Sequence, residues 1–281
     1  MSEMKTVRTR AELEQSLGGV DRKRVGFVPT MGALHAGHLS LVKRAKEECG
    51  TVVVSVFVNP TQFNDLKDLE NYPRDEKRDL ELLGEAGADV VFMPGVAEMY
   101  PEPDTRVFEF GELDKVMEGA TRPGHFNGVA QVVSKLFAMI RPAKAFFGEK
   151  DFQQIAIVKA MVEGLDEKPE IVPCPIVREA DGLAMSSRNT LLTPEHRAAA
   201  PKIYKAMSEG VGKMGEMTPA EVERFVMDTI NSEPLLEVIY FKIVDALTLK
   251  PVENWADSVA IQGCAAVRAG EVRLIDNIRF V

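Results

Sequence analysis

Two histidines, His35 and His38, flank a glycine at the point where a strand pattern gives way to a helix pattern. Residues 25–28 form a short apolar run, and residues 39–45 repeat apolar side chains every three or four positions. A helix N-terminus favours phosphate, because its first N–H groups have no helical partner and its dipole is positive there. Gly37 lets the backbone approach such a ligand closely. The pattern therefore predicts a nucleotide-phosphate site.

Two other interpretations of the histidines remain open. His35 could lie beside a helix cap while His38 packs half-buried, with no ligand at either ring. Zinc is the other alternative, but it needs more ligands than this turn supplies. The chain has only two further histidines, His125 and His196, and its three cysteines lack the spacing of a zinc site. Zinc is therefore disfavoured.

Unusual polar residues follow the ends of four predicted strands. These segments are 29–38, 59–63, 148–154 and 185–188. Because ligands of open parallel sheets bind at the carboxyl ends of the strands, we expect the four segments to form one crevice.

The side chains in these segments suit an anionic substrate. The Lys150 ammonium follows a glycine and acts as a point charge for phosphate. Gln62 and Gln154 both donate and accept, which suits hydroxyl and carboxylate groups. Ser186–Arg188 offers two hydroxyls and a guanidinium on a loop able to close over a triphosphate. Taken singly, each could equally be an ordinary surface group, and the loop at 122–126 could carry a further cation or simply cap a helix.

The overall composition limits the classes of partner. The 281 residues are 45% hydrophobic with a formal net charge of -9, and the isoelectric point is about 5.2. This balance argues against a broad basic surface for nucleic acid or an anionic membrane. No apolar stretch approaches the ~20 residues of a membrane span. Three scattered cysteines are typical of a reduced protein without disulfides, so we expect a cytoplasmic location.

The order of strand and helix patterns predicts an α/β fold. Strand patterns at 51–58, 88–93, 143–147 and 171–177 alternate with helix patterns at 75–86, 128–140 and 151–162. This alternation predicts a Rossmann-like parallel-sheet domain over residues 1–177. Beyond it, helix patterns at 194–214 and 219–230 precede strand patterns at 238–247, 259–267 and 272–275. Residues 178–281 are therefore predicted to form a smaller C-terminal α+β lid domain.

Five motifs carry a resemblance to a known family. PTMGALHAGH, FVNPTQF, RPGHFNGV, FGEKDFQQ and MSSRN occur in this order between residues 25 and 190. Together they resemble the pantoate-β-alanine ligases of the HIGH-motif nucleotidyltransferase-like superfamily. The resemblance implies an AMP-forming acid-amine ligase of pantothenate and coenzyme A biosynthesis. Such an enzyme joins pantoate to β-alanine with ATP and Mg²⁺ through a pantoyl-adenylate intermediate, releases AMP and pyrophosphate, and forms a homodimer.

The resemblance also implies roles at matching positions. The catalytic group would comprise His35, His38, Lys150, Ser186, Ser187 and Arg188. ATP would be bound by Met31, His38, Gly148, Lys150, Asp151, Val177, Met185, Ser186, Ser187 and Arg188. Pantoate would be bound by Pro29, Met31, Gln62, Phe63, Val132, Val133 and Gln154. No Mg²⁺ ligand is assigned. Residues 64–68 depart from the family's glycine-containing form, which leaves the shape of that loop open.

The implied chemistry agrees with these residue types. An ionised carboxylate attacks the α-phosphate without a general base, so the site must bring two anions together and neutralise phosphate charge. No dedicated base for the β-alanine ammonium is identified. The rival functions are a class I aminoacyl-tRNA synthetase, a cytidylyl- or adenylyltransferase with a stable nucleotide product, and a non-catalytic nucleotide sensor.

Overall fold

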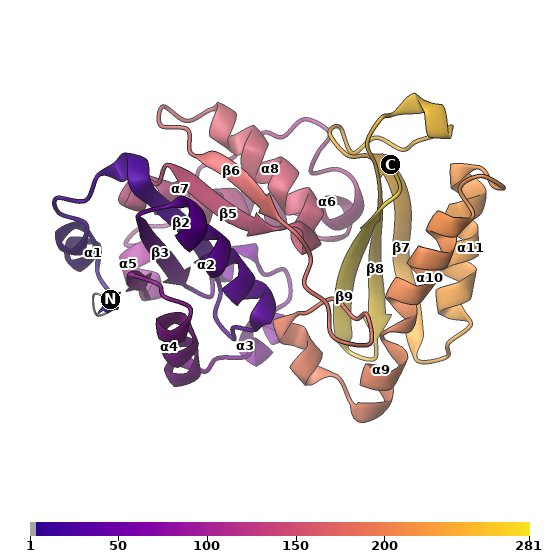
Figure 1. The fold of residues 1–281 in the computed structure, drawn as a ribbon, viewed down its shortest axis with the longest axis horizontal. Coiled ribbons are helices and arrows are strands. Elements are labelled where there is room, and N and C mark those ends of the chain that lie inside the picture. The colour runs from indigo at the N-terminus through magenta and orange to yellow at the C-terminus, as the bar shows by residue number, and fades with distance from the viewer. Residues whose placement is uncertain (1–3) are drawn as a thin grey trace. The chain divides into compact units, whose positions relative to one another are not determined.

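The computed structural model describes residues 4–281 and contains two sheets. The first is a six-stranded parallel sheet (Figure 1). Its strand order is β1-β4-β3-β2-β5-β6. The strands are β1 (Lys5–Val7), β2 (Val25–Thr30), β3 (Thr51–Val56), β4 (Val90–Phe92), β5 (Lys144–Gly148) and β6 (Glu170–Cys174). The middle strands are apolar and rich in β-branched residues, because both of their faces are covered. The predicted Rossmann-like fold is confirmed.

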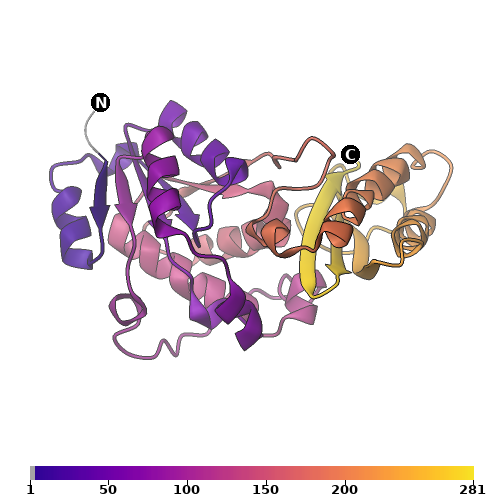
Figure 2. The same cartoon turned by 90° about the horizontal axis from the view of Figure 1, so that it is seen from below.

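Helices cover both faces of this sheet (Figures 1 and 2). On one face, α2 and α4 bury Val42 and Leu83 against Val54 of β3. Helices α1, α7 and α8 cover the other face. There the ring of Phe137 of α7 packs edge-on against that of Phe27 of β2, with centroids 6.1 Å apart. The helices are α1 (Arg10–Ser16), α2 (Ala36–Glu48), α3 (Leu66–Asn71), α4 (Glu76–Glu85), α5 (Val96–Met99), α7 (His125–Ile140) and α8 (Phe152–Glu163).

The strand order reverses between β2 and β5. β2 pairs with β3 on one side and with β5 on the other, while the chain passes from β2 through β3 and β4 before it reaches β5. At such a switch point the crossovers leave in opposite directions, which opens a crevice at the carboxyl ends of the two strands. The histidine turn follows β2, and Gly148 ends β5.

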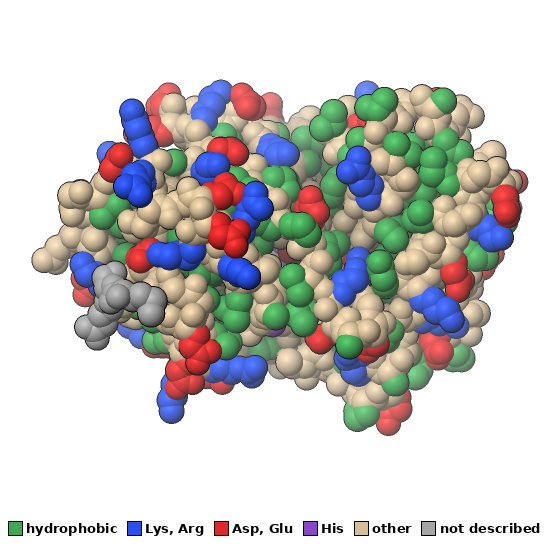
Figure 3. All heavy atoms as spheres, viewed as in Figure 1, with side chains coloured by type: hydrophobic (Ala, Val, Ile, Leu, Met, Phe, Trp, Pro, Cys, Tyr) green, Lys and Arg blue, Asp and Glu red, His purple; other side chains and the backbone are tan. Residues whose placement is uncertain are grey.

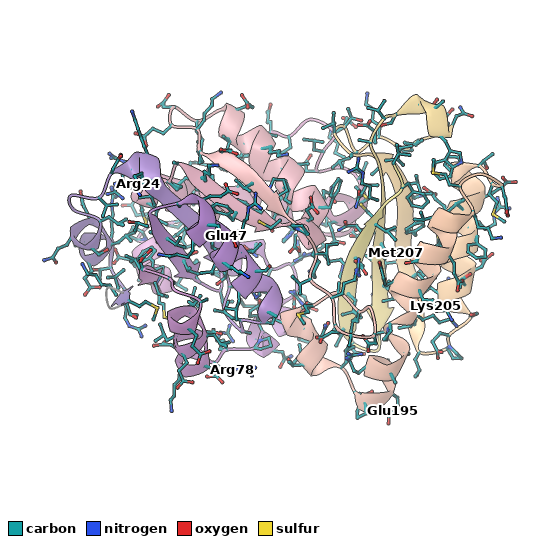
Figure 4. All side chains as sticks on the ribbon, in the orientation of Figure 1. Arg24, Glu47, Arg78, Glu195, Lys205 and Met207 are labelled. Carbon is teal, nitrogen blue, oxygen red and sulfur yellow. The ribbon has the colours of Figure 1, made fainter. Side chains whose placement is uncertain are left out.

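The C-terminal sheet is antiparallel and consists of β7 (Leu236–Asp245), β8 (Ile261–Ala269) and β9 (Val272–Arg279). Helices α10 (Lys202–Gly212) and α11 (Pro219–Asn231) pack on one of its faces. Figure 4 shows Met207 on the sheet side of α10 and Lys205 on its outer side, as expected of an amphipathic helix. The helix pattern at 194–214 is two helices, because Pro201 separates α9 (Pro194–Ala199) from α10.

Contacts between Cα atoms divide the chain into two compact units. The N-terminal unit comprises the chain up to Gly111 together with Arg122–Glu149 and Gln154–Pro175. The C-terminal unit comprises Glu112–Thr121, which contains α6 (Met117–Thr121), together with Lys150–Gln153 and Ile176–Val281. No pattern in the sequence indicates that the two short segments join the C-terminal unit. The division into domains at 1–177 and 178–281 remains a prediction.

Charged side chains of both signs are interspersed over the face drawn in Figure 3. Within residues 4–281, none of the helices combines the length and the apolar character that crossing a bilayer requires.

Candidate active site

The two histidines build the start of α2. His35 is the N-cap residue, and its Nδ1 accepts the Gly37 N–H at 3.2 Å. Nδ1 of His38 accepts the His35 N–H at 3.4 Å, and the two ring centroids are 4.0 Å apart. Because both Nδ1 atoms act as acceptors, the hydrogen bonds assign the proton of each neutral ring to Nε2. The capping interpretation and a phosphate-binding role are therefore compatible, since each ring caps through one nitrogen and carries a donor on the other.

A buried carboxylate shapes the turn before these histidines. Gly32 and Ala33 have φ values of 86° and 50°, in the left-handed region. Asp79 of α4, only 2% exposed, accepts the N–H groups of Ala33 at 2.9 Å and Leu34 at 2.7 Å. A Cβ at Gly32 would lie 2.9 Å from Asp79 Oδ2, so the turn requires a glycine there. Asp79 is not among the residues predicted from the sequence, although an aspartate on the inward face of a predicted helix is a usable signal.

An amide network fixes the FVNPTQF segment. The side chain of Asn59, 1% exposed, donates to Gln62 Oε1 and to the Gly128 carbonyl, both at 3.1 Å. Its Oδ1 accepts the Tyr100 hydroxyl at 2.8 Å. Nε2 of Gln62 donates to the Met31 sulfur at 3.1 Å. The structure thus brings together Met31 and Gln62, two residues predicted to bind pantoate, and it adds Asn59 as the group that orients Gln62.

The RPGHFNGV motif supports the same segment from α7. Nδ1 of His125 donates to the Gln62 carbonyl at 2.7 Å, and Arg122 Nη2 donates to the same oxygen at 3.4 Å. A Cβ at Gly128 would lie 2.3 Å from the Thr61 carbonyl oxygen, so only glycine allows this approach between α7 and the 3₁₀ turn η2 (Pro60–Gln62). The Arg122 side chain therefore contacts the backbone of the Gln62 turn. The N-cap residue of α7 is Gly124, so no side chain of this loop caps the helix.

The other predicted residues of the N-terminal unit occupy several elements. Pro29 lies in β2, and the ring of Phe63 packs edge-on against Tyr72 with centroids 5.8 Å apart. Val132 and Val133 are buried on α7. The remaining two, Gly148 at the end of β5 and Gln154 on α8, are half-buried. The segment at 64–68 contains Asp65, which caps α3.

The other predicted residues belong to the C-terminal unit. Lys150 lies in the 3₁₀ turn η3 (Glu149–Asp151), with Nζ 3.4 Å from Asp151 Oδ1. Val177 and Met185 are neighbours, because the Met185 N–H donates to the Val177 carbonyl at 3.0 Å. The MSSRN segment leads into a short 3₁₀ helix.

In that turn Ser186 caps the 3₁₀ helix η4 (Ser187–Leu191) and accepts the Arg188 N–H at 3.3 Å. Ser187 is buried, with 8% of its surface exposed. Among residues 4–281, no group of three or more His, Cys, Asp or Glu side chains is placed to hold a metal ion. Mg²⁺ in nucleotide sites is bound mainly through substrate phosphates and water, so it requires no such protein cage.

The family is decided by comparison with known proteins. The sequence profile of the pantoate-beta-alanine ligase family matches residues 5–279. The chain belongs to the pantoate-β-alanine ligase family. Pantothenate synthetase of Porphyromonas gingivalis strain ATCC 33277 is 56% identical over 92% of each chain, and that of Bacteroides thetaiotaomicron is 53% identical over 99% of each.

Solved structures agree with this assignment. The crystal structure of pantothenate synthetase from Thermus thermophilus covers 99% of each chain with a TM-score of 0.93 and 48% identity. The pantoate-β-alanine ligase of Francisella tularensis, complexed with beta-gamma ATP and β-alanine, covers 99% of this chain and 98% of its own, with a TM-score of 0.84 and 33% identity. The resemblance seen in the five motifs is confirmed. Membership of the pantoate-β-alanine ligase family decides against the three rival functions.

Asp79 provides a test of how the ligase histidine turn is held. Burial raises the pKa of this carboxyl above 3.8, although its hydrogen bonds from Leu34 and Ala33 lower it. Between 3.8 and the folded-state pKa the native protein binds the proton more tightly than the unfolded chain, so this group's contribution to stability falls as pH rises. A tenfold difference in proton affinity between the two states corresponds to about 1.4 kcal/mol. Asp79→Asn removes this dependence.

The quantity to measure is the difference between the free energies of unfolding of the parent and of Asp79→Asn. We expect this difference, parent minus variant, to decrease as pH rises from about 4 to about 7. Urea unfolding at each pH measures it. Glu85→Gln, which neutralises an exposed carboxylate on the same helix, is the control. A difference that increases with pH would show that the Asp79 carboxyl is stabilised, rather than penalised, by its buried position.

Proposed function

We propose that this chain uses ATP to condense pantoate with β-alanine, giving pantothenate, AMP and pyrophosphate through a pantoyl adenylate. The observation that carries the proposal is the pair of Nε2 donors at the N-terminus of α2, in a chain whose family match spans residues 5–279. The structure of the Francisella relative with beta-gamma ATP and β-alanine supports the assignment of these two substrates.

In the first step a pantoate carboxylate oxygen attacks the α-phosphate, and pyrophosphate leaves. The carboxylate is already ionised, so no base is required, and the barrier arises from bringing two anions together. The Nε2 donors of His35 and His38, the ammonium of Lys150 and the guanidinium of Arg188 would stabilise the phosphate charge. When bound with ATP, Mg²⁺ would supply further charge neutralisation.

Pantoate would be oriented by amides and packed by apolar groups. Gln62 is already oriented by Asn59 and supported by His125, which lowers the cost of ordering it on binding. Gln154 would supply the second amide. The proposed apolar lining consists of Pro29, Met31, Phe63, Val132 and Val133.

The remaining proposed contacts hold the nucleotide. Asp151 would accept from the ribose hydroxyls, and Ser186 and Ser187 would donate to the triphosphate. The proposed nucleotide lining consists of Met31, Gly148, Val177 and Met185. In the second step the β-alanine amine attacks the acyl carbon, the bond to the phosphate oxygen breaks, and AMP leaves.

We also propose a homodimer and a cytoplasmic location. The support for the homodimer is the frequency of symmetric pairing among soluble enzymes. The support for the location is the free state of all three cysteines, Cys49, Cys174 and Cys264.

The reaction itself is tested by omitting components. With ATP, Mg²⁺, pantoate and β-alanine present, AMP and pantothenate should form in equal amounts. Without pantoate, no AMP should form. Without β-alanine, labelled pyrophosphate should still exchange into ATP, because adenylation precedes the amine. AMP formation that is independent of pantoate would contradict the proposed reaction.

The histidine pair is tested by truncation. His38→Ala, and to a similar degree His35→Ala, should lower the adenylation rate by at least about two orders of magnitude, the usual scale for losing a preorganised donor to developing charge. Pantoate-dependent ATP–pyrophosphate exchange measures this rate. His196→Ala, which removes an imidazole from α9, should remain near the parent rate. A folded His38 variant with parent-like exchange would remove these rings from the phosphate site.

Gln62 should discriminate between the two substrates of adenylation. Gln62→Ala should raise KM for pantoate by at least about tenfold with little change for ATP, because it leaves substrate hydroxyl and carboxylate groups unpaired. Gln131→Ala is a matched control, since this buried amide donates to the Asp104 and Arg106 carbonyls, neither of which belongs to the proposed site. Equal losses for pantoate and ATP in the Gln62 variant would indicate a general disturbance of the turn.

A further inference from the structure

Strand β9 buries two consecutive polar residues, Asp276 and Asn277, which are 6% and 3% exposed. Neither belongs to any motif singled out in the sequence. Burial raises the pKa of Asp276, while the Arg178 guanidinium opposes that shift. A buried carboxylate and amide are costly unless they are fully hydrogen-bonded, so the partners of this pair indicate what it does.

Asp276 holds Arg178 in a two-pronged ion pair. Nη1 of Arg178 donates to Oδ2 at 2.6 Å, and Nη2 donates to Oδ1 at 2.9 Å. The same guanidinium donates to the Asn277 carbonyl at 3.2 Å and the Gly182 carbonyl at 3.1 Å. It also lies over the Tyr204 ring of α10, with Cζ 3.6 Å from the centroid. Bidentate pairing and stacking together leave Arg178 a single orientation.

Arg178 lies at one end of the hairpin that delivers the MSSRN turn. Arg178 and Ala184 form an antiparallel bridge, and the Met185 N–H closes the hairpin on Val177. The side chain of Asn189 then donates to the Ala184 carbonyl at 3.0 Å. Fixing Arg178 therefore fixes the backbone that leads directly into Ser186–Arg188.

Asn277 contacts Lys150, the other residue proposed to bind phosphate. Its Nδ2 donates to the Lys150 carbonyl at 3.0 Å, and its Oδ1 accepts Gln262 Nε2 at 2.7 Å. The bond from Gln262 of β8 orients the amide, so that its NH₂ group points at Lys150. The turn that carries the Lys150 ammonium is thus tied to β9 by its backbone.

The alternation of a strand explains how neighbours serve two segments. Successive side chains of a strand point to opposite faces. Asp276 shares its face with Leu274, which packs in the core with α10, whereas Asn277 shares its face with Arg273, which pairs with Glu118 of α6. Two adjacent residues of one strand therefore hold two segments that are well separated in the chain.

We propose that Asp276 and Asn277 are a positioning pair that sets the Lys150 turn and the Ser186–Arg188 turn in a fixed spacing for binding the triphosphate. This inference rests on the proposed roles of Lys150 and Ser186–Arg188. In this role Asp276 and Asn277 act through Arg178 and Lys150 and not as substrate contacts. Their effect arises because a misplacement of about 1 Å in a charged group costs up to about a hundredfold in rate.

The test is Asn277→Leu, which keeps the number and branching of the side-chain heavy atoms but removes the bonds to Lys150 and from Gln262. Pantoate-dependent ATP–pyrophosphate exchange should fall at least about tenfold and KM for ATP should rise, while KM for pantoate stays within about twofold. A purely structural loss would reduce the amount of active enzyme and leave both KM values unchanged. Tyr240→Phe is the matched control, because it also removes a buried hydrogen bond from this sheet, a 2.9 Å bond to Glu118, but it touches neither turn. It should retain parent exchange.

A double variant shows whether Asn277 acts through Lys150. Lys150→Ala should itself lower exchange strongly, and adding Asn277→Leu should then lower it by less than about threefold more. If Asn277→Leu lowers exchange as much in the Lys150→Ala background as in the parent, the positioning role is overturned. Unchanged KM for ATP in Asn277→Leu would also overturn it. Either result would leave the proposed role of Lys150 intact. If Lys150→Ala leaves exchange unchanged, the proposed role of Lys150 is wrong and the inference is overturned with it.

Arg178→Lys decides the question if Asn277→Leu does not fold. Lysine keeps the positive charge opposite Asp276 but loses the two-pronged bond and the stacking on Tyr204. It should raise KM for ATP with little change for pantoate. A folded Arg178→Lys enzyme with the parent KM for ATP would overturn the proposal.

Discussion

The hydrogen bonds between the imidazole Nδ1 atoms and the backbone at the start of α2 determine the chemistry available at this turn. Each bond assigns the proton of a neutral ring to Nε2, so each ring then carries a donor on the nitrogen that does not cap the helix. A donor of this kind suits a phosphate site, because the capping bond sets its position and direction before the ligand arrives. The parallel sheet places this turn at the end of β2, directly beside the end of β5.

Several of the proposed binding groups are held by buried polar side chains for which no contact with substrate is proposed. Asp79 holds the backbone before the histidines, and Asn59 orients Gln62. In the C-terminal unit, Asp276 and Asn277 hold Arg178 and the Lys150 turn. These supporting residues are among the few polar side chains in their cores, where an unpaired polar group would be costly. Rigid support of this kind reduces the ordering that substrates must induce.

Close backbone approach is the second constraint on the site. Gly128 allows α7 to contact the Thr61 carbonyl, which brings His125 within reach of the Gln62 carbonyl. Gly32 allows the turn before His35 to lie against Asp79. In both places the absence of a side chain permits a polar contact that a larger residue would prevent sterically. Glycines inside these motifs therefore determine geometry as much as the named polar residues do.

The sequence alone determined the parallel α/β architecture, the α+β character of the C-terminal part and the family. Apolar runs such as residues 51–58 and the helical periodicity around α2 are local signals, and motif spacing survives in the chain without a structure. Only the tertiary structure revealed Asp79, Asn59 and the Asp276–Asn277 pair as supports. It also showed that the segments at 112–121 and 150–153 belong to the C-terminal unit. For Asp79 and Asn277 the reason is physical: their hydrogen-bond partners are distant in the chain, Asp79 lying 45 residues from Leu34 and Asn277 lying 127 residues from Lys150, so no local pattern identifies these contacts.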